Sequence, residues 1–106
     1  PSVYLNSYSW ITYRTISDRV ENFGHGLRRL IDERGHLSIC AANRPEWLIA
    51  DFACMFQNLI SVPIYCLFTD SEITFVMNNT DISVVVCDEE MLKRFVLLGK
   101  SCPTLR

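Results

Sequence analysis

Three short apolar runs, alternating with segments of helical periodicity, constrain this chain more than any other feature. The runs cover residues 37–41, 60–65 and 81–87, and each has the length of a buried strand. Connections of a few residues join them to the helical segments. Neighbouring parallel strands need a crossover connection between them, and a helix usually provides it. The pattern therefore predicts an α/β fold, a partial parallel sheet of βαβ units with right-handed crossovers and helices on both faces.

The three runs differ in where they are expected to lie in the sheet. The run at 81–87 has β-branched residues at consecutive positions, which is typical of a central parallel strand. Pro63 has no N–H to donate, so the run at 60–65 is expected to meet a strand end or an unpaired edge there. A β-branched and aromatic run at 10–13 predicts a further short strand.

The first helical segment has one apolar face, formed by Ile16, Val20, Phe23, Leu27, Leu30 and Ile31. Thr15 or Ser17 is expected to cap its start, and Gly35 to stop it. Gly24 and Gly26 lie inside, where each costs about 1 kcal/mol relative to alanine, so we expect another backbone to approach closely. They do not follow a strand and lack a third glycine, so they are not a dinucleotide-binding fingerprint.

The second helical segment opens with a recognisable start signal. Asn43 is expected to cap it, Pro45 to occupy the first turn, and Glu46 to reach back as in a capping box. Residues 44–57 are apolar on more than one side, which predicts burial between the sheet and something else. In an isolated chain this surface would favour self-association.

Two further helices follow the second and third apolar runs. Thr69 or Asp70 is expected to cap the first of them, and the last helix is predicted over residues 89–98. The acidic residues 88–90 fit the positively charged first turn of that helix and are not interpreted as a metal site.

Composition sets the size and excludes several classes of protein. The chain has 106 residues, 49% apolar and 21% charged, which is room for one compact domain and too little for a two-domain enzyme. The net charge of −2 comes without a basic face, so nucleic-acid binding is not expected. The longest apolar stretch, residues 59–68, is too short to span a membrane.

The cysteines and the first residue bear on cellular context. The five cysteines are an odd number with no pair closer than twelve residues, which excludes a disulfide framework and CxxC zinc spacing. We expect free thiols that pack as small hydrophobes, in a reducing compartment. The chain starts at Pro1 without a signal pattern, and we expect residues 1–106 to be a single partial domain of something longer.

No side chain can be assigned to catalysis, cofactor binding or a metal. The four glycines do not form a phosphate-binding loop, and His25 and His36 lack a Ser, Cys or carboxylate partner that would suggest a triad, so both are interpreted as surface or capping residues. From its residues alone, the chain is an α/β layer without an active site.

Specific strings nevertheless point to a family. Residues 43–47 read Asn-Arg-Pro-Glu-Trp, and Val-Pro-Ile-Tyr at 62–65 and the strand-like run at 81–88 follow in order and spacing. This pattern resembles the N-terminal part of long-chain fatty acid–CoA ligases, in the adenylate-forming (AMP-binding) superfamily. The stretches at 10–13 and 17–29 extend the resemblance over nearly the whole chain.

The resemblance implies a two-step ligase. In that family ATP, with Mg²⁺, activates a fatty acid carboxylate to an acyl-adenylate, and coenzyme A then takes the acyl group. The family's phosphate loop, adenine-binding motifs, ribose-binding Asp and C-terminal Lys match nothing in this sequence, so no catalytic residue is carried over. The family also implies an intracellular location, in the cytosol or on the cytosolic face of endoplasmic reticulum, mitochondrial or peroxisomal membranes.

The resemblance has one departure and leaves alternatives open. Many long-chain ligases read Asp-Thr-Leu-Gly where this chain has Cys-Leu-Phe-Thr-Asp at 66–70, so the subfamily is undetermined. The chain is interpreted as scaffold of a ligase. The alternative is a non-enzymatic module that binds a full-length ligase or another partner through exposed apolar surface. A flavodoxin-like binding domain is disfavoured because Gly-rich strand ends are lacking.

Overall fold

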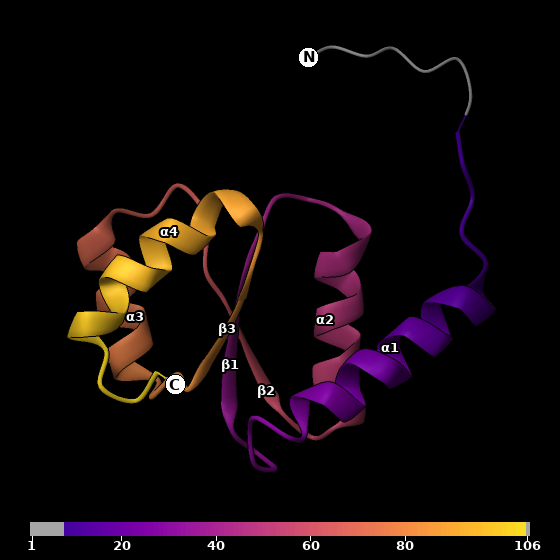
Figure 1. Cartoon of the computed structure of the whole chain (residues 1–106), viewed down its shortest axis with the longest axis horizontal. Coiled ribbons are helices and arrows are strands. Elements are labelled where there is room, and N and C mark those ends of the chain that lie inside the picture. Colours follow the sequence, from indigo (N-terminus) through magenta and orange to yellow (C-terminus); the bar gives the residue numbers. More distant parts are fainter. Residues whose placement is uncertain (1–7, 106) are drawn as a thin grey trace.

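The described part of the chain is a sheet with helices on both faces (Figure 1). The computed structural model describes residues 8–105. Its elements, in chain order, are α1 (Tyr13–Leu27), β1 (His36–Cys40), α2 (Pro45–Phe56), β2 (Ile60–Pro63), α3 (Asp70–Asn79), β3 (Val84–Cys87), α4 (Glu89–Leu98) and a 3₁₀ turn (Gly99–Ser101). After α1, strands and helices alternate, which confirms the predicted α/β class.

The strands are parallel and lie in the order β2-β1-β3. Ser38 of β1 is level with Val62 on one side and Val85 on the other. The prediction of a central strand at 81–87 was therefore wrong for the described sheet, because β3 lies at an edge and β1 is central. A β-branched run indicates that both faces of a strand are covered by helices. It does not indicate whether the strand has a hydrogen-bonded neighbour on each side. Pro63 ends the edge strand β2, as predicted.

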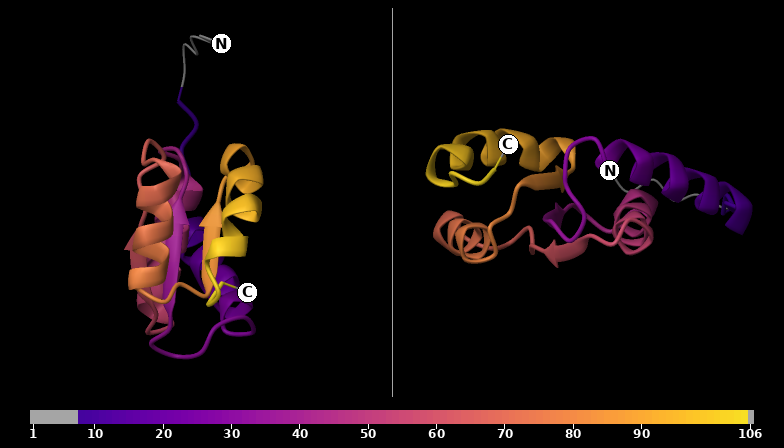
Figure 2. Two further views of the ribbon diagram at one scale, coloured as in Figure 1. Left: turned by 90° about the vertical axis from the view of Figure 1, so that its left-hand side faces the viewer. Right: turned by 90° about the horizontal axis from the view of Figure 1, so that it is seen from below.

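Two helices lie on each face of the sheet, α1 with α2 and α3 with α4 (Figures 1 and 2). The alternation of side chains along β1 divides the core accordingly. Leu37 and Ile39 enter the cluster under α1 and α2, whereas Cys40 enters the cluster under α3 and α4.

Within residues 8–105, no helix has the length and apolar character needed to cross a membrane.

The start of α1 corrects two predictions. Residues 10–12 form no strand, and the helix already begins at Tyr13. Its cap is Thr12, whose hydroxyl accepts a hydrogen bond from the Thr15 N–H at 3.1 Å, so neither Thr15 nor Ser17 is the cap. A threonine three residues ahead satisfies a free N–H of the first turn, which favours the helix over an unpaired strand.

The glycines of α1 have different surroundings. A Cβ on Gly24 would lie 3.0 Å from Gln57 Cγ, so the close neighbour is a side chain and not the backbone that we expected. A Cβ on Gly26 would meet nothing within 4 Å among the described residues. The expectation of a close backbone was therefore wrong at Gly24, and the described residues provide no neighbour for Gly26.

The turns into the strands each use a residue with positive φ: Arg34 (66°), Asn58 (55°) and Asp81 (51°).

The helix α1 ends at Leu27, well before Gly35, so this glycine does not stop the helix as predicted. Its role is steric, because a Cβ there would lie 2.5 Å from Ile31 Cγ1 and 2.9 Å from a backbone oxygen.

The remaining helix starts show which caps are local. Thr69 caps α3, since its hydroxyl accepts from the Glu72 N–H at 3.2 Å, and Asp88 caps α4 by accepting from the Met91 N–H at 3.1 Å. The capping box predicted for α2 was wrong. Arg44 is the cap residue and makes no side-chain cap bond, although Pro45 does open the helix as predicted.

Candidate functional site

Several long-range polar contacts lie at the carboxyl ends of the three strands. Ligands of open parallel α/β sheets bind at this edge. Asp88, which caps α4 through one carboxylate oxygen, accepts the Ala42 N–H on the other at 3.0 Å. The loop after β1 is therefore tied to the end of β3 by a single carboxylate.

Two hollows open at this edge, one on each side of β1. The first, of about 280 Å³, lies between the ends of β1 and β3 and is lined by Arg44, Glu46 and Asp88. The second, of about 450 Å³, lies towards β2 and is lined by Tyr65 and Cys66. Glu89 also lines the first hollow, whereas no charged side chain among the described residues lines the second.

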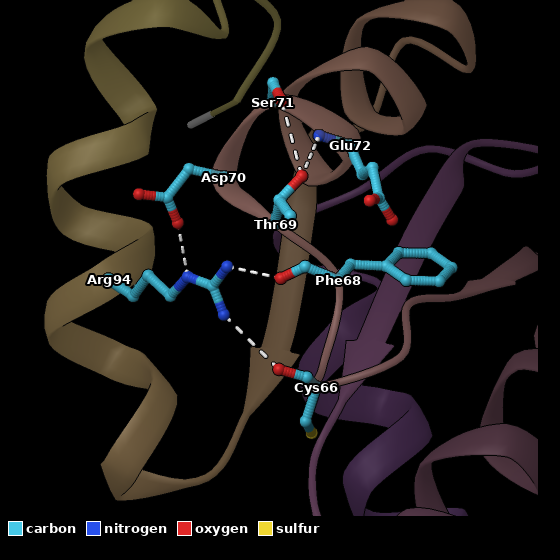
Figure 3. Close-up of polar contacts among 7 residues, drawn as sticks. All are labelled: Cys66, Phe68, Thr69, Asp70, Ser71, Glu72 and Arg94. Carbon is cyan, nitrogen blue, oxygen red and sulfur yellow. Dashed lines mark hydrogen bonds and ion pairs between the residues drawn. The ribbon is translucent and has the colours of Figure 1, made fainter.

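Arg94 of α4 organises the loop after β2 (Figure 3). Its Nε donates to Asp70 Oδ1 at 2.5 Å, its Nη1 donates to the carbonyl of Cys66 at 3.3 Å, and its Nη2 donates to the carbonyl of Phe68. The planar guanidinium suits several acceptors at once. Because Nε, Nη1 and Nη2 each donate a hydrogen bond within the chain, Arg94 holds the loop in place.

Two of the ionic groups at the first hollow, Arg44 and Glu46, form an ion pair. Arg44 Nε lies 2.5 Å from Glu46 Oε1, and both side chains are about half exposed. The hydrogen bond from Arg44 lowers the pKa of Glu46, and the same contact raises the pKa of Arg44. A carboxylate held charged in this way is a poor general base or acid near neutral pH. The pair also explains why Glu46 does not reach back as a capping residue.

The two histidines lie away from this edge. His36 begins β1 at the opposite end of the sheet, and its Nδ1 donates to the carbonyl of Thr80, the C-cap residue that follows α3. His25 is exposed on α1. The structure thus gives His36 a capping contact and His25 a surface position, as the sequence predicted.

The thiols are mostly packed as small hydrophobes. Cys40, Cys54 and Cys102 are buried, whereas Cys66 and Cys87 are partly exposed. Burial raises the pKa of Cys54 to about 11, and burial together with the contact to Cys66 raises that of Cys40 to about 12. The Sγ atoms of Cys40 and Cys66 are 3.7 Å apart, a contact that the sequence did not reveal.

The geometry of the described residues shows how far metal ligands and phosphate-binding groups come together. Across residues 8–105, no three His, Cys, Asp or Glu side chains gather as metal ligands. The hollows at the carboxyl edge lack glycine, and the nearest cations, Arg44 and Arg94, already have carboxylate partners. No catalytic step is assigned to these side chains.

Apolar surface is open along β3, the edge strand. Hollows of about 700 Å³ and 550 Å³ flank it, and both are lined by Leu30, Leu92 and residues of β3. Leu30 is 59% exposed and Leu92 is 53% exposed. We call this surface the β3 groove. A second apolar surface lies on α2, where Met55 and Phe56 are exposed, in agreement with a helix that is apolar on more than one side.

The arrangement of sheet and helices recurs in adenylate-forming enzymes of known structure. The A domain of a carboxylic acid reductase from Segniliparus rugosus superposes with a TM-score of 0.89 at 18% identity, over 96% of this chain and 17% of that one. The anthranilate CoA ligase AuaEII superposes with a TM-score of 0.85 at 20% identity, over 90% of this chain and 19% of that one. At these identities the comparison defines the fold.

The sequence comparisons define the family. The family model described as AMP-binding enzyme matches residues 1–104. The chain is 40% identical over 86 residues to long-chain-fatty-acid–CoA ligase 5 of Rattus norvegicus, covering 76% of this chain and 12% of that protein. It is 33% identical over 99 residues to long chain acyl-CoA synthetase 2 of Arabidopsis thaliana, covering 92% and 15%. The chain therefore belongs to the AMP-binding enzyme family, and it spans only a small part of the length of these relatives.

Proposed function

We propose that this chain is structural scaffold of a long-chain fatty acid–CoA ligase. In its full-length form such an enzyme would activate a fatty acid with ATP to an acyl-adenylate and then transfer the acyl group to coenzyme A. The observation that carries the proposal is the 40% identity to a protein named as a long-chain-fatty-acid–CoA ligase. The adenylate-forming fold agrees with it.

Adenylation gives the carboxyl carbon of the fatty acid a good leaving group in place of a poor one. ATP and Mg²⁺ would take part in this step at groups outside this segment. The residues of this chain contribute position. Asp88 ties the loop after β1 to α4, and Arg94 ties the loop after β2 to the same helix. We infer that one helix thus keeps two loops of the carboxyl edge in register for the parts of the enzyme that bind substrates.

A chimera tests this role. The part of this chain that matches the rat ligase would replace the corresponding segment of that enzyme, and palmitoyl-CoA formation would be measured from palmitate, ATP and coenzyme A. We expect the chimera to fold and to retain most of the parent activity. A matched chimera with Ile39→Asp in the fully buried core should lose both fold and activity. A well-folded chimera without activity would contradict the proposal.

The isolated chain provides the complementary test. Incubated alone with labelled ATP, palmitate and coenzyme A, it should form neither adenylate nor thioester, and turnover would contradict a scaffold role. The second candidate function, a non-enzymatic interaction module, is favoured by the open β3 groove. Self-association of the isolated chain through this edge is expected in either case, whereas stable binding to a full-length ligase is expected only of a module.

A further inference from the structure

The thiols of Cys40 and Cys66 form a pair that the scaffold role does not use. Cys40 ends β1 and Cys66 lies in the loop after β2, and their Sγ atoms are 3.7 Å apart. We propose that this pair is an oxidative modification site, at which a peroxide converts the two thiols into a Cys40–Cys66 disulfide.

The two thiols differ in access to solvent, which assigns their roles. Cys66 is partly exposed and lines the open hollow of about 450 Å³ at the carboxyl edge. Cys40 is fully buried, and its pKa is raised to about 12 by burial and by the contact with Cys66, so it stays protonated near neutral pH. The thiolate is the form that reacts with peroxides. Cys66 is therefore the thiol that is oxidised first, and Cys40 is the one that resolves it.

The chemistry balances with hydrogen peroxide as the oxidant. The Cys66 thiolate attacks one peroxide oxygen, so that an S–O bond forms, the O–O bond breaks, and the departing hydroxide takes up the Cys66 proton as water. The product is a sulfenic acid on Cys66. The Cys40 sulfur then attacks that sulfur, forming the S–S bond and breaking the S–O bond, and the second water leaves with the Cys40 proton. The two thiols together lose two electrons, which reduce the peroxide.

The surroundings favour closure between these two sulfurs. A disulfide needs its sulfurs at about 2.05 Å, so the pair must approach further, and a loop side chain can do this more easily than one in a strand. Arg94 holds the loop through the carbonyls of Cys66 and Phe68 and leaves the Cys66 thiol free to turn towards β1. Cys87 is the competing partner, because it is level with Cys40 across the sheet. Burial and Asp88 raise its pKa, so little of Cys87 is present as the thiolate that reacts with peroxide near neutral pH.

Peptide mapping identifies the bond. The dilute chain would be treated with hydrogen peroxide, alkylated to block free thiols, and digested without reductant. Trypsin is unsuitable because it does not cleave between Arg44 and Pro45, so four cysteines stay on one peptide. A glutamyl endopeptidase with chymotrypsin cuts after Glu46 and Phe56, and it separates Cys40, Cys54, Cys66 and Cys87 from one another. We expect the main cross-linked product to join the peptides of Cys40 and Cys66.

Two variants and a stability measurement complete the test. Cys66→Ser should abolish the intramolecular cross-link, and Cys87→Ser should leave it unchanged. Because the bond closes a loop between residues 26 positions apart, oxidation should raise the Tm of the wild type by roughly 10 °C and that of Cys66→Ser not at all. A Cys40–Cys87 product, cross-links only between chains, or over-oxidised Cys66 with free Cys40 would each overturn the proposal.

Discussion

Replacing Arg94 by leucine is expected to lower the free energy of unfolding by about 2 kcal/mol. The side chain is 29% exposed and donates to two backbone carbonyls as well as to Asp70. A hydrogen bond from a charged group contributes about 1.5–3 kcal/mol to the free energy of unfolding. The bond to the Cys66 carbonyl is long, at 3.3 Å, so it contributes less than this. The Asp70 carboxylate is 67% exposed, so the ion pair itself adds only about 0.2–1 kcal/mol.

Two control variants separate the carbonyl contacts from the ion pair. Asp70→Asn keeps the contacts to Cys66 and Phe68 and should cost about 1 kcal/mol at most. Arg94→Lys keeps the charge but lacks the planar fork, so its cost should fall between the other two. The assay is urea unfolding followed by circular dichroism, at low and at high salt. Equal costs for Asp70→Asn and Arg94→Leu, or a cost of Arg94→Leu that disappears at high salt, would show that the ion pair and not the carbonyl contacts carries the stability.

Four further predictions concern other parts of the chain. Gly26→Ala should raise the free energy of unfolding by about 0.5–1 kcal/mol, since its Cβ has open space, whereas Gly35→Ala should lower it because of the clash with Ile31; thermal unfolding that ranks them the other way contradicts this. Ser38→Ala should be neutral or stabilising in urea unfolding, because the buried Ser38 hydroxyl has no hydrogen-bond partner among residues 8–105, and a loss above about 1 kcal/mol would argue against it. Leu92→Lys in the β3 groove should reduce self-association and hydrophobic-dye binding, measured by sedimentation velocity and fluorescence, and unchanged association would point to another surface. Burial raises the pKa of Cys54 from 9.0 to about 11, so this thiol ionises at lower pH in the unfolded chain than in the folded one. The free energy of unfolding should therefore fall as pH rises from about 9 to about 11. Urea unfolding at each pH should show a smaller fall for Cys54→Ala.

The features that depend on neighbours in sequence were predictable. The bounds of α4 agree with the predicted range 89–98, and Thr69 caps α3 as expected, because a capping side chain reaches an N–H only three residues away. The order of strands and helices follows from hydrophobic periodicity, which is also local. Two cap predictions failed: Thr12 caps α1 in place of Thr15 or Ser17, and at α2 the Glu46 carboxylate is taken by Arg44.

The candidate site was not predictable to the same extent. No sequence pattern assigned a residue to it, and the groups that organise the carboxyl edge act across long separations in the chain. Arg94 reaches carbonyls 28 and 26 positions away, and Asp88 reaches Ala42 across 46 positions. No spacing rule connects such residues, and they meet only because β1 has β2 on one side and β3 on the other.

By itself the sequence determined the α/β class, the family resemblance and most of the helix boundaries, since all of these are recorded in patterns a few residues long. The tertiary structure alone decided that β3 is an edge strand, that Arg94 holds the loop after β2, and that Cys40 meets Cys66. The physical reason is that helices covering both faces make central and edge strands equally apolar. The order of the strands across the sheet depends on which strands form backbone hydrogen bonds with each other, and the long-range contacts depend on that order.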